Sequence, residues 1–341
     1  MKKVRIVYLD VLRVIAGFCI VLIHQSTIVN DANLINTIRF DWITGAILNS
    51  ITHWSVPIFF MISGLTLLDF RKKYSTIVFC KKRCSKVILP FVIWTFIYIL
   101  WQQSYGEKIN GVSDILNKTI CGPASYHLWF FYVLIGMYLC TPILSLLTEH
   151  PKALSYLIVL CVIKNQVYPF LQTFWNINIC FDIPFAGKYL EYFLLGYFLK
   201  DLQLKKAYRY LIYAGGLAGV LASTLSCILM CIGKSKNYLY FIGYETIPTL
   251  LISIAVFTLF KQINWASIFS NRKYKILSVL SDATFGIYLV HLIIQRFYWL
   301  FLNPDFNNVN GMLLGTVIVY FISLSIVVCL KKIPLLKRIV P

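Results

Sequence analysis

Runs of about 20 apolar residues, separated by short polar gaps, dominate this sequence. A run of that length crosses the hydrocarbon core of a bilayer as a helix, because lipid offers the backbone no hydrogen-bond partner. Hydropathy places these runs at residues 7–29, 52–70, 86–103, 127–147, 152–172, 184–200, 207–232, 244–261, 276–300 and 310–330. We therefore predict an all-α fold, a polytopic membrane helix bundle with about ten transmembrane helices.

Charge supports the same class of protein. Only 13% of the 341 residues are charged, whereas soluble domains carry roughly 25%. The formal net charge is +19, and most of the basic residues fall in alternate gaps between the apolar runs. This is the pattern of the positive-inside rule, and it predicts that both termini are cytoplasmic. It explains the positive charge by topology and membrane lipid, so we expect no nucleic acid partner.

The gaps between the runs are short. The longest, at 30–51, 71–85 and 104–126, cannot hold a soluble catalytic domain. The first run is too long for a signal peptide and contains ionisable residues, so it should remain as the first helix. We predict a single membrane-embedded domain over residues 1–341, whose chemistry takes place within the bundle.

The first run carries Asp10, Arg13 and His24. Ionisable residues inside a span are costly, so they are functional candidates. Arg13 and His24 are separated by 11 positions, which is about 20° from three whole turns and about 16 Å along a helix. They should share a face, with Asp10 near enough to pair with Arg13. Taken singly, Arg13 could instead snorkel to the inner head groups, and His24 could be a helix-end residue.

A second histidine is expected close to this face. His291 lies about 15 residues into the ninth run, near the expected depth of His24, and Tyr288 shares its helix face. His53 begins the second run, where an interfacial or structural role is the simpler interpretation.

Five segments together resemble the acyltransferase 3 family of integral membrane acyltransferases, which modify cell-surface glycans. Asp10, Arg13 and His24 are similar to its first-helix motif. Residues 57–64 are similar to its Phe-Phe-x-x-Ser-Gly segment, and residues 82–90 are similar to its basic turn before a proline. Residues 127–132 are similar to the start of its fourth helix, and residues 284–291 are similar to a late helix. The resemblance spans about residues 5–330. Val56-Pro57 and Lys86 depart from the common pattern, and Lys86 puts a bidentate phosphate contact there in doubt.

The resemblance implies a bacterial inner-membrane, multi-pass enzyme. It would transfer an acyl group, acetyl first and succinyl as an alternative, from cytoplasmic acyl-CoA to a hydroxyl of a surface polysaccharide or its lipid-linked precursor. Acyl-CoA would be a substrate, and we expect no bound cofactor and no metal. His24 is the expected base or a covalent acyl carrier, with Arg13 holding the donor. Arg83 and Lys86 are expected at the CoA phosphates, although attraction to anionic lipid also explains basic residues there.

Further substrate contacts are expected from Ser63, His127, Trp129, Tyr288 and His291. Ser63 could relay the acyl group, or its neighbour Gly64 could only permit close helix packing. Trp129 could stack on a sugar, or belong to an interfacial aromatic belt.

The competing class is a transporter or flippase of glycan precursors without transferase activity, whose intramembrane charges would line a substrate path. No inverted repeat is evident and few broken helices are expected, which favours the enzyme. A sensor or scaffold would not need Arg13 and His24 on one face. Oligomeric state, including a homo-oligomer, is left open.

Overall fold

In the computed structural model, the described residues are 6–31, 34–107, 109, 111–231, 240–302 and 308–341. The rest of the predicted domain 1–341, including the last residue of the predicted span 207–232, lies outside them. The described residues form helices and no strand. Within this part of the chain, nine helical stretches are long and apolar enough to cross a membrane. They are Val7–Gln25, Arg39–Lys72, Thr76–Gln103, Tyr126–Glu149, Pro151–Trp175, Lys206–Cys231, Tyr240–Gln262, Asn271–Leu302 and Val309–Lys332. A polytopic membrane helix bundle is thus the fold, while the sidedness of its termini stays a prediction.

Two of the expected boundaries were wrong. The run at 184–200 is not a full span, because its helix α11 is only Leu190–Lys200. Its 11 residues extend about 16 Å, half of a hydrocarbon core. The expected loop at 30–51 is largely helical instead. It contains α2 (Leu34–Thr37) and α3 (Arg39–Thr52), and α3 meets α4 (Ser55–Leu67) at a break at His53 and Trp54.

Broken helices are also more frequent than the sequence suggested. Three wider π-helical segments occur in the described residues, at Cys84–Ile88, Asn117–Cys121 and Ile163–Val167. The first joins α5 (Thr76–Arg83) to α6 (Leu89–Gln103), and the third joins α9 (Pro151–Val162) to α10 (Tyr168–Trp175). Such segments leave local backbone groups out of register and are frequent at functional sites.

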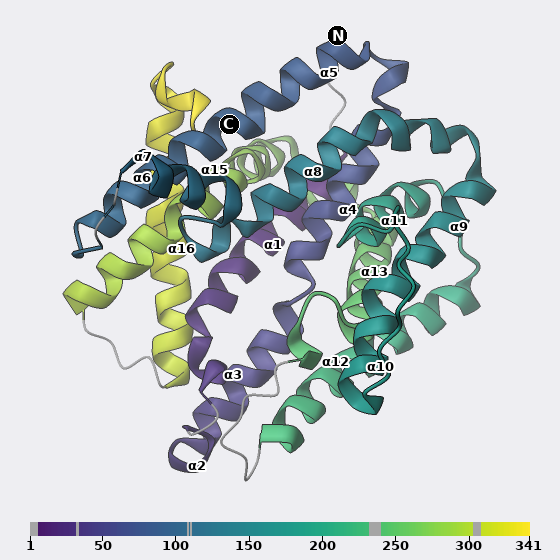
Figure 1. Cartoon of the computed structure of the whole chain (residues 1–341), viewed down its shortest axis with the longest axis horizontal. Helices are drawn as coiled ribbons and strands as arrows, with labels where there is room; N and C mark the ends of the chain where they lie inside the picture. The colour runs from purple at the N-terminus through teal and green to yellow at the C-terminus, as the bar shows by residue number, and fades with distance from the viewer. Residues whose placement is uncertain (1–5, 32–33, 108, 110, 232–239, 303–307) are drawn as a thin grey trace. The chain divides into compact units, whose positions relative to one another are not determined.

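Contacts within the chain group it into two compact units. The first contains Met1–Thr66 and Pro151–Ser325, and the second contains Leu67–His150 and Ile326–Pro341. In the first unit, α1 (Val7–Gln25) contacts α15 (Asn271–Leu302), α3 and α13 (Ile247–Gln262), and α11 contacts α9 and α13 (Figure 1). In the second, the Trp94 indole of α6 donates to the Ile339 carbonyl at 2.8 Å, tying the C-terminal segment to this helix. This unit also holds α7 (Val112–Leu116) and α8 (Trp129–Leu144).

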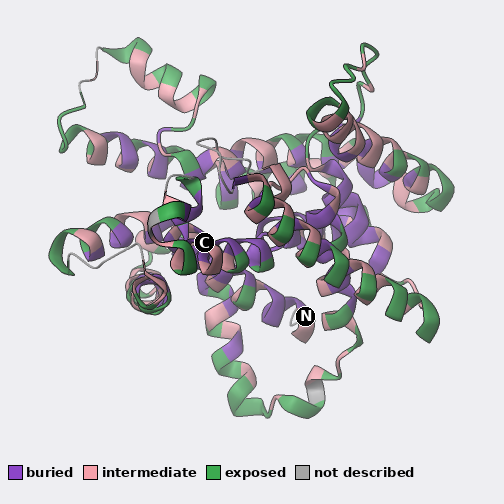
Figure 2. Ribbon diagram, turned by 90° about the horizontal axis from the view of Figure 1, so that it is seen from below, coloured by how far each residue is buried: buried purple, intermediate pink, exposed green. Residues whose placement is uncertain are grey.

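The helices pack through small residues and expose large apolar ones. On α12 (Lys206–Cys231), the buried positions are Gly216, Gly219, Ser223, Cys227 and Cys231, whereas leucines such as Leu217 and Leu229 are exposed. Figure 2 shows the same alternation of buried and exposed residues along most helices. Apolar side chains lose nothing by facing lipid, and small residues let neighbouring backbones approach. The distribution is therefore that of a membrane bundle.

The start of α13 shows how local sequence sets the helix boundaries. Thr246 is extended, and its hydroxyl accepts the backbone N–H of Thr249 at 3.4 Å, while Pro248 occupies the first turn, where no N–H is needed. The hydroxyl of Thr249 also donates to the Gly243 carbonyl at 2.7 Å. These bonds fix the turn of residues 243–246 that enters α13. The remaining short helix, α14, covers Trp265–Ile268.

Candidate functional site

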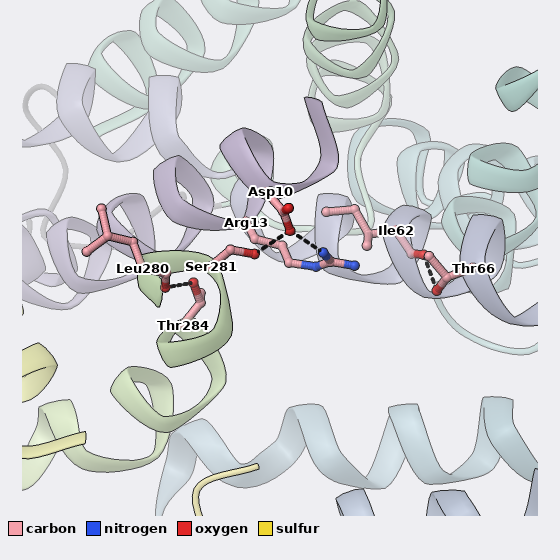
Figure 3. A network of polar contacts seen from close by, with 7 residues as sticks. All are labelled: Asp10, Arg13, Ile62, Thr66, Leu280, Ser281 and Thr284. Carbon is pink, nitrogen blue, oxygen red and sulfur yellow. Dashed lines mark hydrogen bonds and ion pairs between the residues drawn. The ribbon is translucent and has the colours of Figure 1, made fainter. Parts of the chain in front are cut away.

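One end of the site is an acid–base pair on α1. Asp10 is 2% exposed, and its Oδ1 accepts from the Arg13 guanidinium at 2.9 Å and from the Ser281 hydroxyl of α15 at 2.7 Å. Figure 3 shows Asp10 between these two donors, with the guanidinium extending toward the side of α4 that carries Ile62 and Thr66. The expected pairing of Asp10 with Arg13 is present. A carboxylate held on two sides fixes the direction of the guanidinium.

The other end of the site is a pair of histidines. The rings of His24 on α1 and His291 on α15 lie with their centroids 5.1 Å apart and their planes at 34°. The Gln295 side chain also donates to the backbone carbonyl of His24, at 2.6 Å. Ser281 and His291 are ten residues apart on α15, about 15 Å along the helix. The two helices therefore place a cationic end and an imidazole end along one shared seam, as the spacing of Arg13 and His24 predicted.

The backbone of α15 selects the tautomer of His291. Its Nδ1 lies 2.7 Å from the carbonyl oxygen of Tyr288. A carbonyl only accepts, so this bond requires the proton on Nδ1 and leaves a lone pair on Nε2. The same reasoning applies to His53, whose Nδ1 lies 3.0 Å from the Asn49 carbonyl. Both rings are therefore held in the form that has a basic Nε2.

His53 is the site residue that sequence analysis assigned to a structural role. It lies in the break between α3 and α4, is 9% exposed, and stacks on the Tyr244 ring with centroids 4.7 Å apart. Asn49, whose carbonyl oxygen faces the His53 ring, donates its side-chain amide to the Ser26 hydroxyl at 3.1 Å, two positions after His24. Among the residues that the structure describes, no group of three or more His, Cys, Asp or Glu side chains is placed to hold a metal ion.

Ser63 belongs to a tight helix crossing. A Cβ on the adjacent Gly64 would lie 1.7 Å from the backbone oxygen of Phe193 on α11, and one on Gly196 would lie 1.9 Å from the oxygen of Met61 on α4. Each glycine thus admits the backbone of the other helix. Close packing explains why Gly64 follows Ser63, and an acyl relay through Ser63 stays a prediction.

The second unit contains the other four predicted residues. The guanidinium carbon of Arg83 lies 5.8 Å from the Phe79 ring centroid and 5.6 Å from that of Tyr138. The Nε of Arg83 is buried and has no hydrogen-bond partner among the described residues. Lys86 is exposed, within the π-helical segment that begins immediately after Arg83. Arg83 is thus a half-buried cation held by two aromatic rings, and its contact with the CoA phosphates stays a prediction.

His127 and Trp129 lie at the start of α8. The His127 ring is 1% exposed, with Nδ1 3.0 Å from the Ser125 hydroxyl and its centroid 4.9 Å from that of Tyr98. Trp129 is half-buried and meets Phe130 edge to face. These contacts embed both residues in an aromatic cluster at the entry to the helix. Contact of His127 and Trp129 with substrate stays a prediction.

A family model described as an acyltransferase domain matches residues 6–332, nearly the whole chain. The chain belongs to the acyltransferase 3 family. No curated protein and no solved structure matches it significantly. Membership makes this protein a membrane acyltransferase, and it agrees with the resemblance carried by the five sequence segments.

The acyltransferase also contains a buried acid that sequence analysis missed. Glu191 on α11 is 0% exposed and accepts from Asn165 at 2.6 Å and from Gln166 at 2.7 Å. Both donors lie in the π-helical segment Ile163–Val167. Its only sequence signal is a carboxylate within an apolar run, and its partners are about 25 positions away. His53 had a comparable signal, a histidine at a helix boundary, but nothing in the sequence placed it beside His24.

Proposed function

We propose that this protein transfers an acyl group, acetyl first, from cytoplasmic acyl-CoA to a hydroxyl of a cell-surface polysaccharide or its lipid-linked precursor. We place it in the bacterial inner membrane. The observation that carries the proposal is the seam between α1 and α15, with Arg13 and Asp10 at one end and the His24–His291 pair at the other. Such a seam supplies a fixed cation and a base, the two groups that this transfer requires.

The chemistry needs a base and a stabilised leaving group. The sugar hydroxyl attacks the thioester carbonyl, so the new C–O ester bond forms as the C–S bond breaks. An imidazole takes the hydroxyl proton and returns it to the departing CoA thiolate, so no net proton is released. His24 is our choice for this base, with His291 beside it to orient the acceptor or share the proton. A covalent acyl-histidine would split the same transfer into two steps.

The cations are assigned to the donor. Arg13 stays protonated, so it cannot act as a base, and at about 16 Å from His24 along α1 it is suited to hold an anionic group of the donor. Asp10 orients it through the 2.9 Å bond. Arg83, with its guanidinium over two rings, and Lys86 are proposed to bind the phosphates of CoA, since a planar guanidinium matches phosphate oxygens. Trp129, Tyr288 and His127 are proposed acceptor contacts.

The decisive test uses the purified full chain in detergent. It is incubated with radiolabelled acetyl-CoA and glycan from cells that lack the gene, which supplies an acceptor without the modification. We expect label in the glycan and one free CoA thiol released for each acetyl group transferred. A transporter would consume no thioester. Transporters are the second candidate class because several of the described helices are interrupted. A glycan without label, together with no release of CoA thiol, would refute the proposed transfer.

A further inference from the structure

Four residues from two loops of the first unit lie together next to His53. Lys188 and Tyr189 precede α11, and Tyr244 and Glu245 precede α13. The Lys188 amino group lies 3.3 Å from the Glu245 carboxylate. Tyr189 follows Lys188 directly and Tyr244 precedes Glu245, so this ion pair brings the two tyrosine-bearing loops together. By the predicted topology, the end of α1 that carries His24 lies on the outer side, where a glycan acceptor would approach.

The two tyrosines are held rigidly. The Tyr192 hydroxyl donates to the Tyr244 carbonyl at 2.7 Å, and the Tyr244 ring stacks on His53. Tyr189 has a left-handed backbone, with φ at 62°, and its ring stacks on Phe60 with centroids 5.6 Å apart and planes at 15°. A non-glycine residue rarely adopts this conformation, and the conformation persists only where its surroundings impose it. The surroundings of Tyr189 therefore fix the position of its ring.

The charged pair is accessible. The side chain of Lys188 is 72% exposed and that of Glu245 is 27% exposed. An exposed ion pair contributes little to stability, so folding does not explain its position beside two fixed aromatic rings. A carboxylate accepts from hydroxyl groups and an ammonium donates to them. An aromatic ring, in turn, offers an apolar face with a polar edge.

We propose that Lys188, Tyr189, Tyr244 and Glu245 form the subsite that binds the acceptor sugar. This inference rests on the proposed function and adds to it a binding site for the substrate class. The tyrosines supply apolar contact for the C–H face of a pyranose, while Glu245 and Lys188 bind its hydroxyl groups. Because Tyr244 stacks on His53, and Asn49 joins this part of the chain to Ser26, a sugar bound here lies next to the end of α1 that carries His24.

The test separates binding of acceptor from binding of donor. Purified Glu245→Gln and Tyr244→Leu are assayed with radiolabelled acetyl-CoA while the concentration of unmodified glycan is varied. We expect the KM for glycan to rise about tenfold or more and the KM for acetyl-CoA to stay within about twofold. Glu149→Gln and Tyr156→Leu are matched controls, since both residues are exposed and lie outside the subsite, and their KM for glycan should not change.

Other outcomes overturn the assignment. A KM for glycan within about twofold of wild type in both variants would show that the subsite does not bind the acceptor. So would a parallel rise of both KM values, which is the signature of general distortion. If Tyr244→Leu does not accumulate in the membrane, Glu245→Gln decides alone, because it leaves the stacked ring of Tyr244 in place. Failure of the wild type to transfer acetyl at all would instead refute the proposed function.

Discussion

The crossing of α4 and α11 gives a sharp prediction for Gly64→Ala. The new Cβ would lie 1.7 Å from the Phe193 oxygen and 2.6 Å from its carbonyl carbon. Ordinary van der Waals contact begins at about 3.4 Å. The helices would therefore have to separate by roughly 1.5–2 Å, because the obstacle is backbone and no side chain can rotate away.

The expected cost is large. Overpacking against side chains typically costs about 1–3 kcal/mol, and a backbone obstacle places Gly64→Ala at or above the upper end, at about 3 kcal/mol. Gly136→Ala on α8 is the matched control, because a Cβ there meets nothing within 4 Å. In that helix interior, alanine should be favoured over glycine by up to about 1 kcal/mol. The change from glycine to alanine is thus expected to lower the free energy of unfolding at position 64 and to raise it at position 136.

The assay is thermal unfolding of the purified variants in detergent, followed by tryptophan fluorescence. We expect Gly64→Ala, and likewise Gly196→Ala, to lower the Tm by several degrees, while Gly136→Ala leaves it unchanged or raises it. A Tm for Gly64→Ala equal to that of the wild type would show that the helices do not approach as closely as described, and the packing argument would fail.

Two further substitutions test the cationic groups. Asp10→Asn removes the charge that orients Arg13, so the transfer rate in the radiolabel assay should fall about 10- to 100-fold; a normal rate would exclude Asp10 as an orienting residue. Arg83→Lys keeps the charge but loses the planar guanidinium and its ring contacts, so the KM for acetyl-CoA should rise about tenfold. Lys82→Arg is the control, because Lys82 is an exposed neighbour, and its KM for acetyl-CoA should change little. An unchanged KM for acetyl-CoA in Arg83→Lys would mean that Arg83 serves membrane topology and does not bind the donor.

The features that followed from sequence are those governed by one helix. The 3.6-residue period alone places Asp10 beside Arg13 and brings Arg13 and His24 to one face. The number of residues between the start of the ninth run and His291 predicted that His291 lies at nearly the same membrane depth as His24. The separation of 5.1 Å between the two ring centroids agrees with this prediction. The membrane class followed from apolar run length, since the bilayer sets that length physically.

The features that did not follow depend on how chain segments meet. His53 lies next to the site because the chain breaks between α3 and α4, and no residue type at that break demands it. The half-length α11 has the hydropathy of a span, yet regular helix begins only at Leu190, after the left-handed Tyr189. Glu191 is satisfied by a π-helical segment far away in sequence. Long-range pairing of this kind leaves no periodic signal.

The proposed transfer depends most directly on the imidazole of His24. It is tested by producing His24→Ala in cells that lack the native gene, then measuring both the acetyl content of the surface glycan and the protein level in the membrane. His150→Ala is the matched control, because His150 is exposed and lies between η6 (Ser145–Glu149) and α9. We predict that acetyl esters disappear with His24→Ala and persist with His150→Ala, at equal abundance of the two proteins. Unchanged acetylation with His24→Ala at normal abundance would contradict the account.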